Sequence, residues 1–301
     1  MPADKSVPRI LHLHSSFNPG GKELRAVRLM NAFAGKAEHT VVSATPGEYG
    51  AVQRVAKGVQ VVYPKDFPSL TGLPLPGRMH ALARAMQDFD LVLTYNWGAM
   101  DAVMAHTLFA ASMNLPALIH HEDGFNADEI DSLKTRRNWY RRVALGRSAA
   151  IVVPSTGLLR TARYVWHQPE ARTHLIPNGI PVARFRKAPR PDSLPRLIKR
   201  EGEKWVGTLA GLRTVKNLPR LVRAFAPLPP EWQLVIVGEG PEREAIAAEA
   251  ERLEVRDRVH LPGPVDDPAK AMGLFDIFAL SSDTEQFPLS MVEAMAAALP
   301  V

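Results

Sequence analysis

The chain has 301 residues, no cysteine, 46% apolar residues and 23% charged residues. This composition is typical of a globular protein of about two domains, and it excludes a disulfide scaffold, a thiolate metal site and a disordered chain. The first 180 residues carry 20 Lys and Arg against 14 Asp and Glu, whereas the rest of the chain carries 17 of each. The N-terminus has no room for a signal peptide and no apolar run approaches the length of a membrane span, so we expect a cytoplasmic protein.

In the first part of the chain, short apolar runs rich in β-branched residues alternate with stretches of helical period. Strands are expected at residues 10–14, 40–43, 59–63, 91–95, 117–120, 150–153 and 174–176, and helices at 23–33, 78–86 and 99–113. The first helix is expected to bury one face, made of Leu24, Val27, Met30 and Ala34. This alternation predicts a parallel sheet with helices on both faces.

A second series of the same kind follows a proline-rich, basic stretch at residues 184–203, which we expect to be a linker. Its strands are expected at 205–210, 234–237, 259–261 and 277–280, and its helices at 218–225, 242–253, 268–274 and 289–298. Asn217 is the candidate cap of the first of these helices. We therefore predict an α/β protein with two doubly wound domains, residues 1–183 and 204–301. The last residues, 299–301, have the composition of a fifth strand, so we expect the second sheet to be incomplete.

A basic cluster lies at residues 134–147, which contain no acid. Beside Trp139 and Tyr140, its six cations are Lys134, Arg136, Arg137, Arg141, Arg142 and Arg147. Such a cluster suits phosphates or an anionic lipid surface. The alternative is a solvated helix face. Because no nucleic-acid-binding motif accompanies the charge, we expect no nucleic-acid partner.

The segments after each strand are the expected place for ligands in open parallel sheets. A helix starting near Pro288 places Glu285 in the loop before it and Glu293 in its second turn, so the two carboxylates flank a positive helix end. This arrangement suits a ligand with hydroxyls at both ends and phosphates in the middle, such as a nucleotide-sugar. The alternative is that Glu285 caps the helix and Glu293 is a surface residue.

Two further segments support an anionic ligand. Arg213 and Lys216 follow a strand and precede a helix, where two cations suit a diphosphate, although such a pair is also common on ordinary surfaces. Gly20 and Gly21 lead from the first strand into a helix, where the backbone can approach a ligand closely, or where they simply form a tight turn.

The segment TEQFPLSMVEAMAAALPV at residues 284–301 resembles the signature of the retaining glycosyltransferases of family 4, in which two glutamates are separated by seven residues. The segments VGTLAGLRTVKNLPRLVRAF, LVIVGEGPERE, VHLPGPVDD and THLIPNGIPVARF are similar to that family in order and spacing. The resemblance implies a GT-B architecture, with two Rossmann-like domains that face a cleft. It also implies that the C-terminal domain holds most of the nucleotide-sugar donor and the N-terminal domain most of the acceptor.

Carried over by position, the resemblance implies that Arg213 and Lys216 hold the donor diphosphate and stabilise the leaving nucleotide in place of a metal ion. Glu293 would accept hydrogen bonds from the ribose and Glu285 from the sugar. The resemblance also implies that Gly20 and Gly21 let the first loop approach the donor phosphates, and that residues 239–241, with Glu239 and Gly240, and Val265 lie near the nucleotide base. The substrate would be a UDP-, GDP- or ADP-sugar, with no metal and no other cofactor.

The acceptor side is less defined by the resemblance. A family histidine corresponds to the region of His120, His121 and Asp123, and the sequence leaves open which of them acts near the acceptor. We list His121 and Asp123 as acid/base or acceptor-orienting candidates.

The resemblance implies transfer of a sugar, with retention, to a polysaccharide, lipid-linked or cell-envelope acceptor. The basic first domain would dock near an anionic membrane. One alternative is a nucleotide-sugar-binding or regulatory protein without turnover, and another is a basic surface adaptor that uses the scaffold as a platform. Relatives in the family continue past the position of Val301, so we expect the sequence to be partial.

Overall fold

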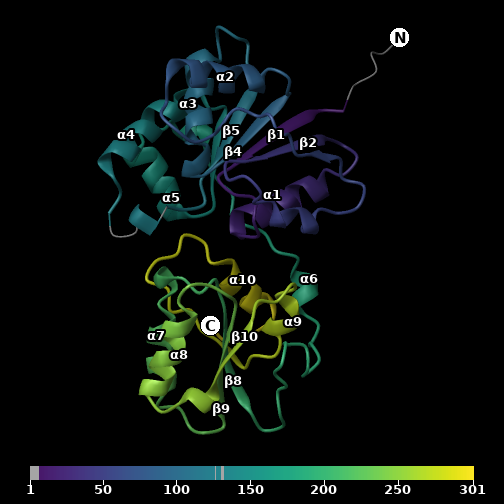
Figure 1. Cartoon of the computed structure of the whole chain (residues 1–301), viewed down its shortest axis with the longest axis vertical. Coiled ribbons are helices and arrows are strands. Elements are labelled where there is room, and N and C mark those ends of the chain that lie inside the picture. The colour runs from purple at the N-terminus through teal and green to yellow at the C-terminus, as the bar shows by residue number, and fades with distance from the viewer. Residues whose placement is uncertain (1–6, 126, 130–131) are drawn as a thin grey trace. The chain divides into compact units, whose positions relative to one another are not determined.

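The computed structural model describes residues 7–125, 127–129 and 132–301 (Figure 1). The chain divides into two compact units, Met1–Asn178 and Gly179–Val301. The stretch 184–203, expected to be a linker, belongs to the second unit, where Leu194 is buried.

The described residues of the first unit form a seven-stranded parallel sheet with the order β3-β2-β1-β4-β5-β6-β7. Its strands are β1 (Arg9–His14), β2 (Glu38–Ser43), β3 (Val61–Val62), β4 (Leu91–Tyr95), β5 (Ala117–His121), β6 (Ala150–Val153) and β7 (Thr173–Leu175). Its α-helices are α1 (Gly21–Ala32), α2 (Pro76–Met86), α3 (Met100–Phe109), α4 (Thr135–Ala144) and α5 (Thr156–Arg160). The strand order reverses between β1 and β4, which is the switch point where sheets of this kind bind ligands.

Strand β1 shows why helices cover both faces of this sheet. Because side chains alternate along a strand, Leu11 and Leu13 point into the apolar core that α2 and α3 cover. His12 and His14 lie on the opposite face with Tyr95, in the layer that α1 covers. The first layer is apolar, whereas the second contains polar rings.

Helix α1 differs in part from its predicted face. Val27 and Met30 are buried as expected, but the helix ends at Ala32 and Ala34 is exposed beyond it. The buried stripe instead begins one residue earlier than the predicted face, at Glu23, which is 4% exposed. The apolar pattern could not reveal this register because a charged residue occupies one of its positions.

Four of the six cations of the basic cluster lie in α4, and the expectation of a solvated face or a free ligand surface is wrong for part of the cluster. Arg141 is completely buried and pairs with Glu129. Arg136, Arg142 and Arg147 are exposed. The sequence of the cluster does not indicate which of its arginines is buried, because the acidic partner of Arg141, Glu129, lies just before the cluster.

The described residues of the second unit form a four-stranded parallel sheet with the order β10-β9-β8-β11. Its strands are β8 (Lys204–Leu209), β9 (Trp232–Val237), β10 (Val259–Gly263) and β11 (Ile277–Phe278). Its α-helices are α6 (Val182–Phe185), α7 (Leu218–Phe225), α8 (Arg243–Arg252), α9 (Ala269–Met272) and α10 (Leu289–Ala296). In strand β9, Leu234 and Ile236 pack in the core of α7 and α8, whereas Val235 and Val237 pack in the core of α9 and α10 (Figure 1). The Phe278 amide of β11 donates to the Pro300 carbonyl (2.9 Å), so the last residues run beside this strand.

Helix α7 has the predicted bounds, but Asn217 is not its cap. Asn217 has a left-handed backbone with a φ of 44°, and its side chain donates to Asp283 Oδ1 (3.0 Å) instead of bonding a helix amide. The residue therefore connects two loops, a contact that local sequence cannot reveal.

None of the helices among the described residues is long and apolar enough to cross a lipid bilayer.

Candidate functional site

The switch point of the second sheet lies between β8 and β11, and the loops that follow these two strands are joined to one another. Ser281 Oγ donates to the Lys216 carbonyl (2.8 Å), and the Asp283 amide donates to the Val215 carbonyl (2.9 Å). The second loop leads through Pro288 into α10. The segments with the predicted phosphate cations and the predicted sugar acid are therefore held together at the place where parallel sheets bind ligands.

Lys216 and Glu285 form an ion pair between these two loops. Ser282 Oγ donates to the same Glu285 oxygen (2.7 Å). The two charged side chains are 18% and 22% exposed, so ligands can reach them. The structure therefore brings into direct contact two of the four side chains that are predicted to bind the diphosphate, ribose and sugar of the donor.

The other two predicted donor residues lie on the same elements. Arg213 is exposed and begins the short 3₁₀ turn that ends at Lys216. Glu293 lies in the second turn of α10, as the position of Pro288 predicts, and is only 7% exposed. A carboxylate so shielded from water is a strong acceptor for hydroxyl groups.

Glycines bring the loop after β9 against the loop after β8. A Cβ at Gly238 would lie 1.9 Å from the Ala210 carbonyl oxygen, and a Cβ at Gly240 would lie 2.5 Å from that of Leu212. The Leu212 amide donates to the Glu239 carbonyl (2.9 Å). Residues 239–240, predicted near the nucleotide base, therefore lie directly beside the loop of Arg213.

A cavity of about 460 Å³ lies along β10, and Glu239, Arg243 and Gly263 are among its lining residues. Val265, also predicted near the base, lies just beyond Gly263 and packs at the edge of the core formed with α9 and α10.

In the first unit, the loops after β1 and β4 meet at the other switch point. A Cβ at Gly98 would lie 2.1 Å from Ser15 Cβ, so only glycine permits this approach. Gly20 precedes α1, and a Cβ there would lie 2.6 Å from Glu23 Oε2. Glu23 pairs with Lys22, and burial raises the pKa of Glu23 although Lys22 opposes this. The start of α1 therefore already has a carboxylate beside it.

Asp123 forms the centre of a polar cluster at the carboxyl edge of the first sheet. Arg25 of α1 donates from Nη2 to Asp123 Oδ2 (2.6 Å) and from Nη1 to Asn178 Oδ1 (2.9 Å). The Asp123 amide donates to Asn96 Oδ1 (2.8 Å). Burial raises the pKa of Asp123 above its ordinary value, and the charge of Arg25 opposes the shift.

The two adjacent histidines point to different places. His121 stacks on Tyr95 (4.9 Å between ring centroids), which in turn stacks on His14 (4.0 Å), so three rings line the ends of β5, β4 and β1. Burial and the nearby charge of Arg25 lower the pKa of His121 well below its usual value, so the ring is neutral at pH 7. His120 is 0% exposed and bonds Thr94 Oγ1 (2.9 Å).

Sequence reasoning missed three members of the Asp123 cluster: Arg25, Asn96 and Asn178. Asn96 and Asn178 both lie in segments that follow strands, and that position was the available signal. Nothing in the sequence indicates Arg25 as a site residue, because it lies in α1 and the periodic pattern of this helix identifies only its apolar face.

Across residues 7–125, 127–129 and 132–301, no three His, Asp or Glu side chains are grouped in a way that could hold a metal ion.

Comparisons with known proteins cover almost the whole chain. Residues 19–184 match a family model described as Glycosyltransferase Family 4, and residues 190–301 match one described as Glycosyl transferases group 1. A putative glycosyltransferase, EpsF of Bacillus subtilis (strain 168), is 26% identical over 99% of this chain and 79% of its own length. A GDP-mannose-dependent alpha-mannosyltransferase of Mycobacterium tuberculosis (strain CDC 1551 / Oshkosh) is 27% identical over 85% of this chain and 67% of its own length.

Among solved structures, Anabaena HepE in complex with UDP and glucose has a TM-score of 0.77 and 21% identity. The match covers 98% of this chain and 80% of HepE.

Proposed function

Because the chain belongs to Glycosyltransferase Family 4, we propose that it transfers a sugar from a nucleoside-diphosphate-sugar to a polysaccharide, lipid-linked or cell-envelope acceptor, with retention at the anomeric carbon. Its α/β fold, with two Rossmann-like units, is the GT-B class predicted from the sequence and is shared with solved GT-B glycosyltransferases.

The observation that carries the proposal is the contact between Lys216 and Glu285 at the switch point of the second sheet. In the proposed reaction, Lys216 and Arg213 bind the donor diphosphate and stabilise the charge that develops on the leaving nucleotide, which is the part a metal ion plays elsewhere. Glu285 accepts hydrogen bonds from sugar hydroxyls near the reacting carbon. Glu293 accepts from the ribose hydroxyls.

The remaining donor contacts are proposed at the glycine-rich loops. Glu239, Gly240 and Val265 would lie near the base, beside the cavity along β10. Gly20 and Gly21 would let the first loop approach the donor phosphates. HepE has been solved with UDP, with UDP-glucose, and with UDP and glucose together, which supports a nucleotide-sugar as the donor class.

On the acceptor side, Asp123 and His121 are proposed to orient or deprotonate the acceptor hydroxyl. Asp123 is held by Arg25 and has a raised pKa, which brings a carboxylate closer to the range of a general base. His121 is neutral at pH 7 and can accept a hydrogen bond from the acceptor hydroxyl.

The exposed face of α4 is proposed to bind an anionic membrane at the inner side of the cell envelope. Trp139 is 64% exposed and lies on this face with Val143, Arg136 and Arg142. A tryptophan flanked by arginines suits the interface between lipid headgroups and acyl chains, where acceptors of the proposed kind would be found.

A screen of UDP-, GDP- and ADP-sugars by thermal shift tests the donor proposal, since a ligand of the folded state raises the unfolding temperature. We expect one nucleotide class to stabilise the wild type. Arg213→Ala should weaken its binding by roughly 10- to 100-fold, which is the effect of losing a charged hydrogen bond. Arg223→Ala is the matched control, because Arg223 is an arginine of α7 that pairs with Glu249 outside the site.

Glu285→Ala should abolish both transfer to an acceptor and hydrolysis of the donor. The transfer assay uses the stabilising donor with alkyl glycosides and with vesicles containing diacylglycerol or phosphatidylinositol as acceptors. Donor binding without any transfer or hydrolysis by the wild type would favour the alternative, a nucleotide-sugar-binding protein without turnover.

A further inference from the structure

Arg141 is a fully buried cation on the inner side of α4. It donates two hydrogen bonds to the Glu129 carboxylate, from Nη1 to Oε1 and from Nη2 to Oε2, each 3.0 Å long. Burial raises the pKa of Glu129, but the hydrogen bonds from Arg141 and Arg137 outweigh this and lower the pKa below its usual value. Glu129 is therefore ionised, and the two residues form a bidentate charged pair.

Arg141 also compensates a second carboxylate, that of Glu122. Both oxygens of Glu122 are enclosed and make no direct hydrogen bond within the described part of the chain. Arg141 Nε and His120 Nε2 each lie 3.6 Å from Glu122 Oε2. An enclosed carboxylate is costly without a nearby cation, so Glu122 as well as Glu129 depends on Arg141.

Three aromatic rings surround the Arg141 guanidinium. Its central carbon lies 4.9 Å from the ring centroid of Trp97, 5.4 Å from Phe125 and 5.2 Å from Trp166. Trp97 follows β4, and Phe125 follows β5. Arg141 is therefore in contact with both of the loops that leave the centre of the first sheet.

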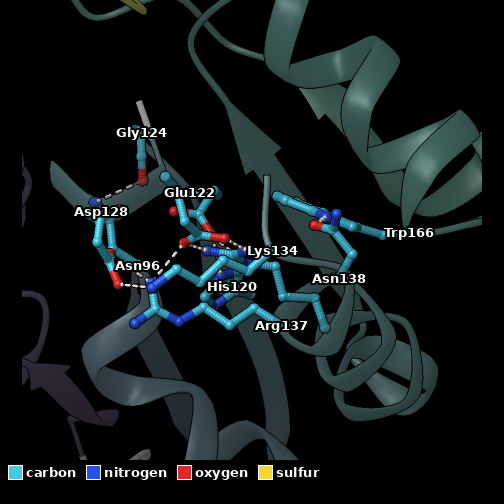
Figure 2. Close-up of polar contacts among 11 residues, drawn as sticks. Asn96, His120, Glu122, Gly124, Asp128, Lys134, Arg137, Asn138 and Trp166 are labelled. Carbon is cyan, nitrogen blue, oxygen red and sulfur yellow. Dashed lines mark hydrogen bonds and ion pairs between the residues drawn. The ribbon is translucent and has the colours of Figure 1, made fainter. Parts of the chain in front are cut away.

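These two loops fix the backbone of Asp123. Asn96 Oδ1 accepts from the Asp123 amide (2.8 Å), and Asn96 Nδ2 donates to the Gly124 carbonyl (3.5 Å). On the other side, Asp123 follows Glu122, which Arg141 compensates. Figure 2 shows the hydrogen bond between Asn96 and Gly124 as a dashed line.

We propose that Arg141 is a positioning residue for the acceptor side of the site, because it locks the loops after β4 and β5 in the arrangement that presents Asp123 to Arg25. The inference rests on the proposed function, in which Asp123 serves the acceptor. Replacing buried ion pairs by apolar residues is often neutral or stabilising, so fold stability alone does not account for the charges at Glu122, Glu129 and Arg141. A role in fixing the geometry of the two loops accounts for these charges.

Hydrogen–deuterium exchange on the full chain, without substrate, tests the proposal independently of turnover. Arg141→Lys keeps a positive charge but cannot form the bidentate pair. The double variant Arg141→Met with Glu122→Gln removes the cation together with one of the two carboxylates that depend on it, and Glu129 keeps its hydrogen bond from Arg137 Nη1 (3.0 Å). In both variants we expect exchange at residues 122–125 to rise at least about 10-fold, with β1 and β2 unchanged. Arg160→Met, at an exposed arginine of α5, should change neither region.

Transfer kinetics supply the second measurement. With the panel acceptor that gives the highest rate, Arg141→Lys should raise the acceptor KM about 10-fold and leave the donor KM within about twofold of the wild type. Unchanged exchange at residues 122–125 in both variants would overturn the proposal. So would exchange that rises equally across the whole first sheet, because that result assigns Arg141 a general structural role. If the wild type transfers nothing but the exchange responds as expected, the proposed function has failed and the role of Arg141 in positioning Asp123 stands.

Discussion

Gly238 is the residue at which backbone geometry most directly limits the sequence. Its φ is 148°, and a Cβ would lie 1.9 Å from the backbone oxygen of Ala210, which cannot move aside as a side chain could. Gly238→Ala should therefore lower the free energy of unfolding of the second unit by roughly 2 to 4 kcal/mol, through steric overlap and backbone strain together. Urea denaturation followed by fluorescence would measure the loss.

Gly179→Ala is the control for this substitution, because a Cβ at Gly179 meets no atom within 4 Å. Its free energy of unfolding should stay within about 0.5 kcal/mol of that of the wild type, as for most surface changes. Equal midpoints for the two variants would show that the loops after β8 and β9 can separate without cost.

Single residues also show where sequence reasoning is limited. Glu285 and Glu293 were placed correctly before and within α10, because the position of a proline fixes a helix start. The partners of Asn217 and Arg141 could not be predicted. Asn217 contacts Asp283 and Arg141 contacts Glu129, and in both cases the tertiary fold brings the acid close. The residue type alone does not indicate which hydrogen-bond partner an asparagine or an arginine will have.

Among the elements, α4 has two faces that differ in burial. Its inner face holds Arg141, whereas Trp139, Arg136 and Arg142 are exposed. The charge reversal Arg136→Glu with Arg142→Glu should reduce binding to phosphatidylglycerol vesicles at least about 10-fold, because each arginine near such a surface contributes about 1 kcal/mol. Binding of the wild type should fall as salt is added. Vesicle sedimentation would measure both effects.

The matched control for α4 is the double variant Arg186→Glu with Lys187→Glu, which changes the net charge by the same amount at two exposed cations of the second unit. It should bind the vesicles about as well as the wild type. If both variants lost binding to the same extent, net charge and not the face of α4 would account for the attraction.

The bounds of the elements were predictable where periodicity is strong. Strands β4 and β6 and helix α7 have the bounds that their apolar patterns indicate. The sequence pattern does not reveal the buried cation of α4, and it does not include Glu23 in the buried face of α1. Both exceptions arise because a charged side chain occupies an interior position, which an apolar pattern cannot represent.

At the scale of the whole molecule, buried histidines predict that the first unit loses stability first in acid. Burial lowers the pKa of His12 to about 3, and lowers those of His14 and His121 well below the usual value. Such a histidine is neutral when folded and protonates near pH 6.5 when unfolded. Its stabilising effect is therefore complete above pH 6.5 and is lost as the pH falls toward the folded value.

Between pH 6.5 and pH 5 the loss is about 2 kcal/mol for each strongly shifted histidine. Exchange measured on peptides of each unit should therefore rise in the first unit before the second, where His260 is the histidine with a lowered pKa among the described residues. His14→Phe keeps a ring against Tyr95 but removes one titrating group, so it should move the acid transition of the first unit to lower pH. The same transition in wild type and variant would contradict the assignment.

In the ion pair between Lys216 and Glu285, each side chain serves as the counter-ion of the other. Small inorganic anions that approach Lys216 must compete with the carboxylate of Glu285, and they have no hydrogen-bond donor that could bind this carboxylate in place of the lysine. A molecule that brings an anionic group for the lysine and hydroxyl donors for the glutamate can replace both halves of the pair at once. We therefore expect the ion pair between these two loops to favour such a molecule over simple inorganic anions.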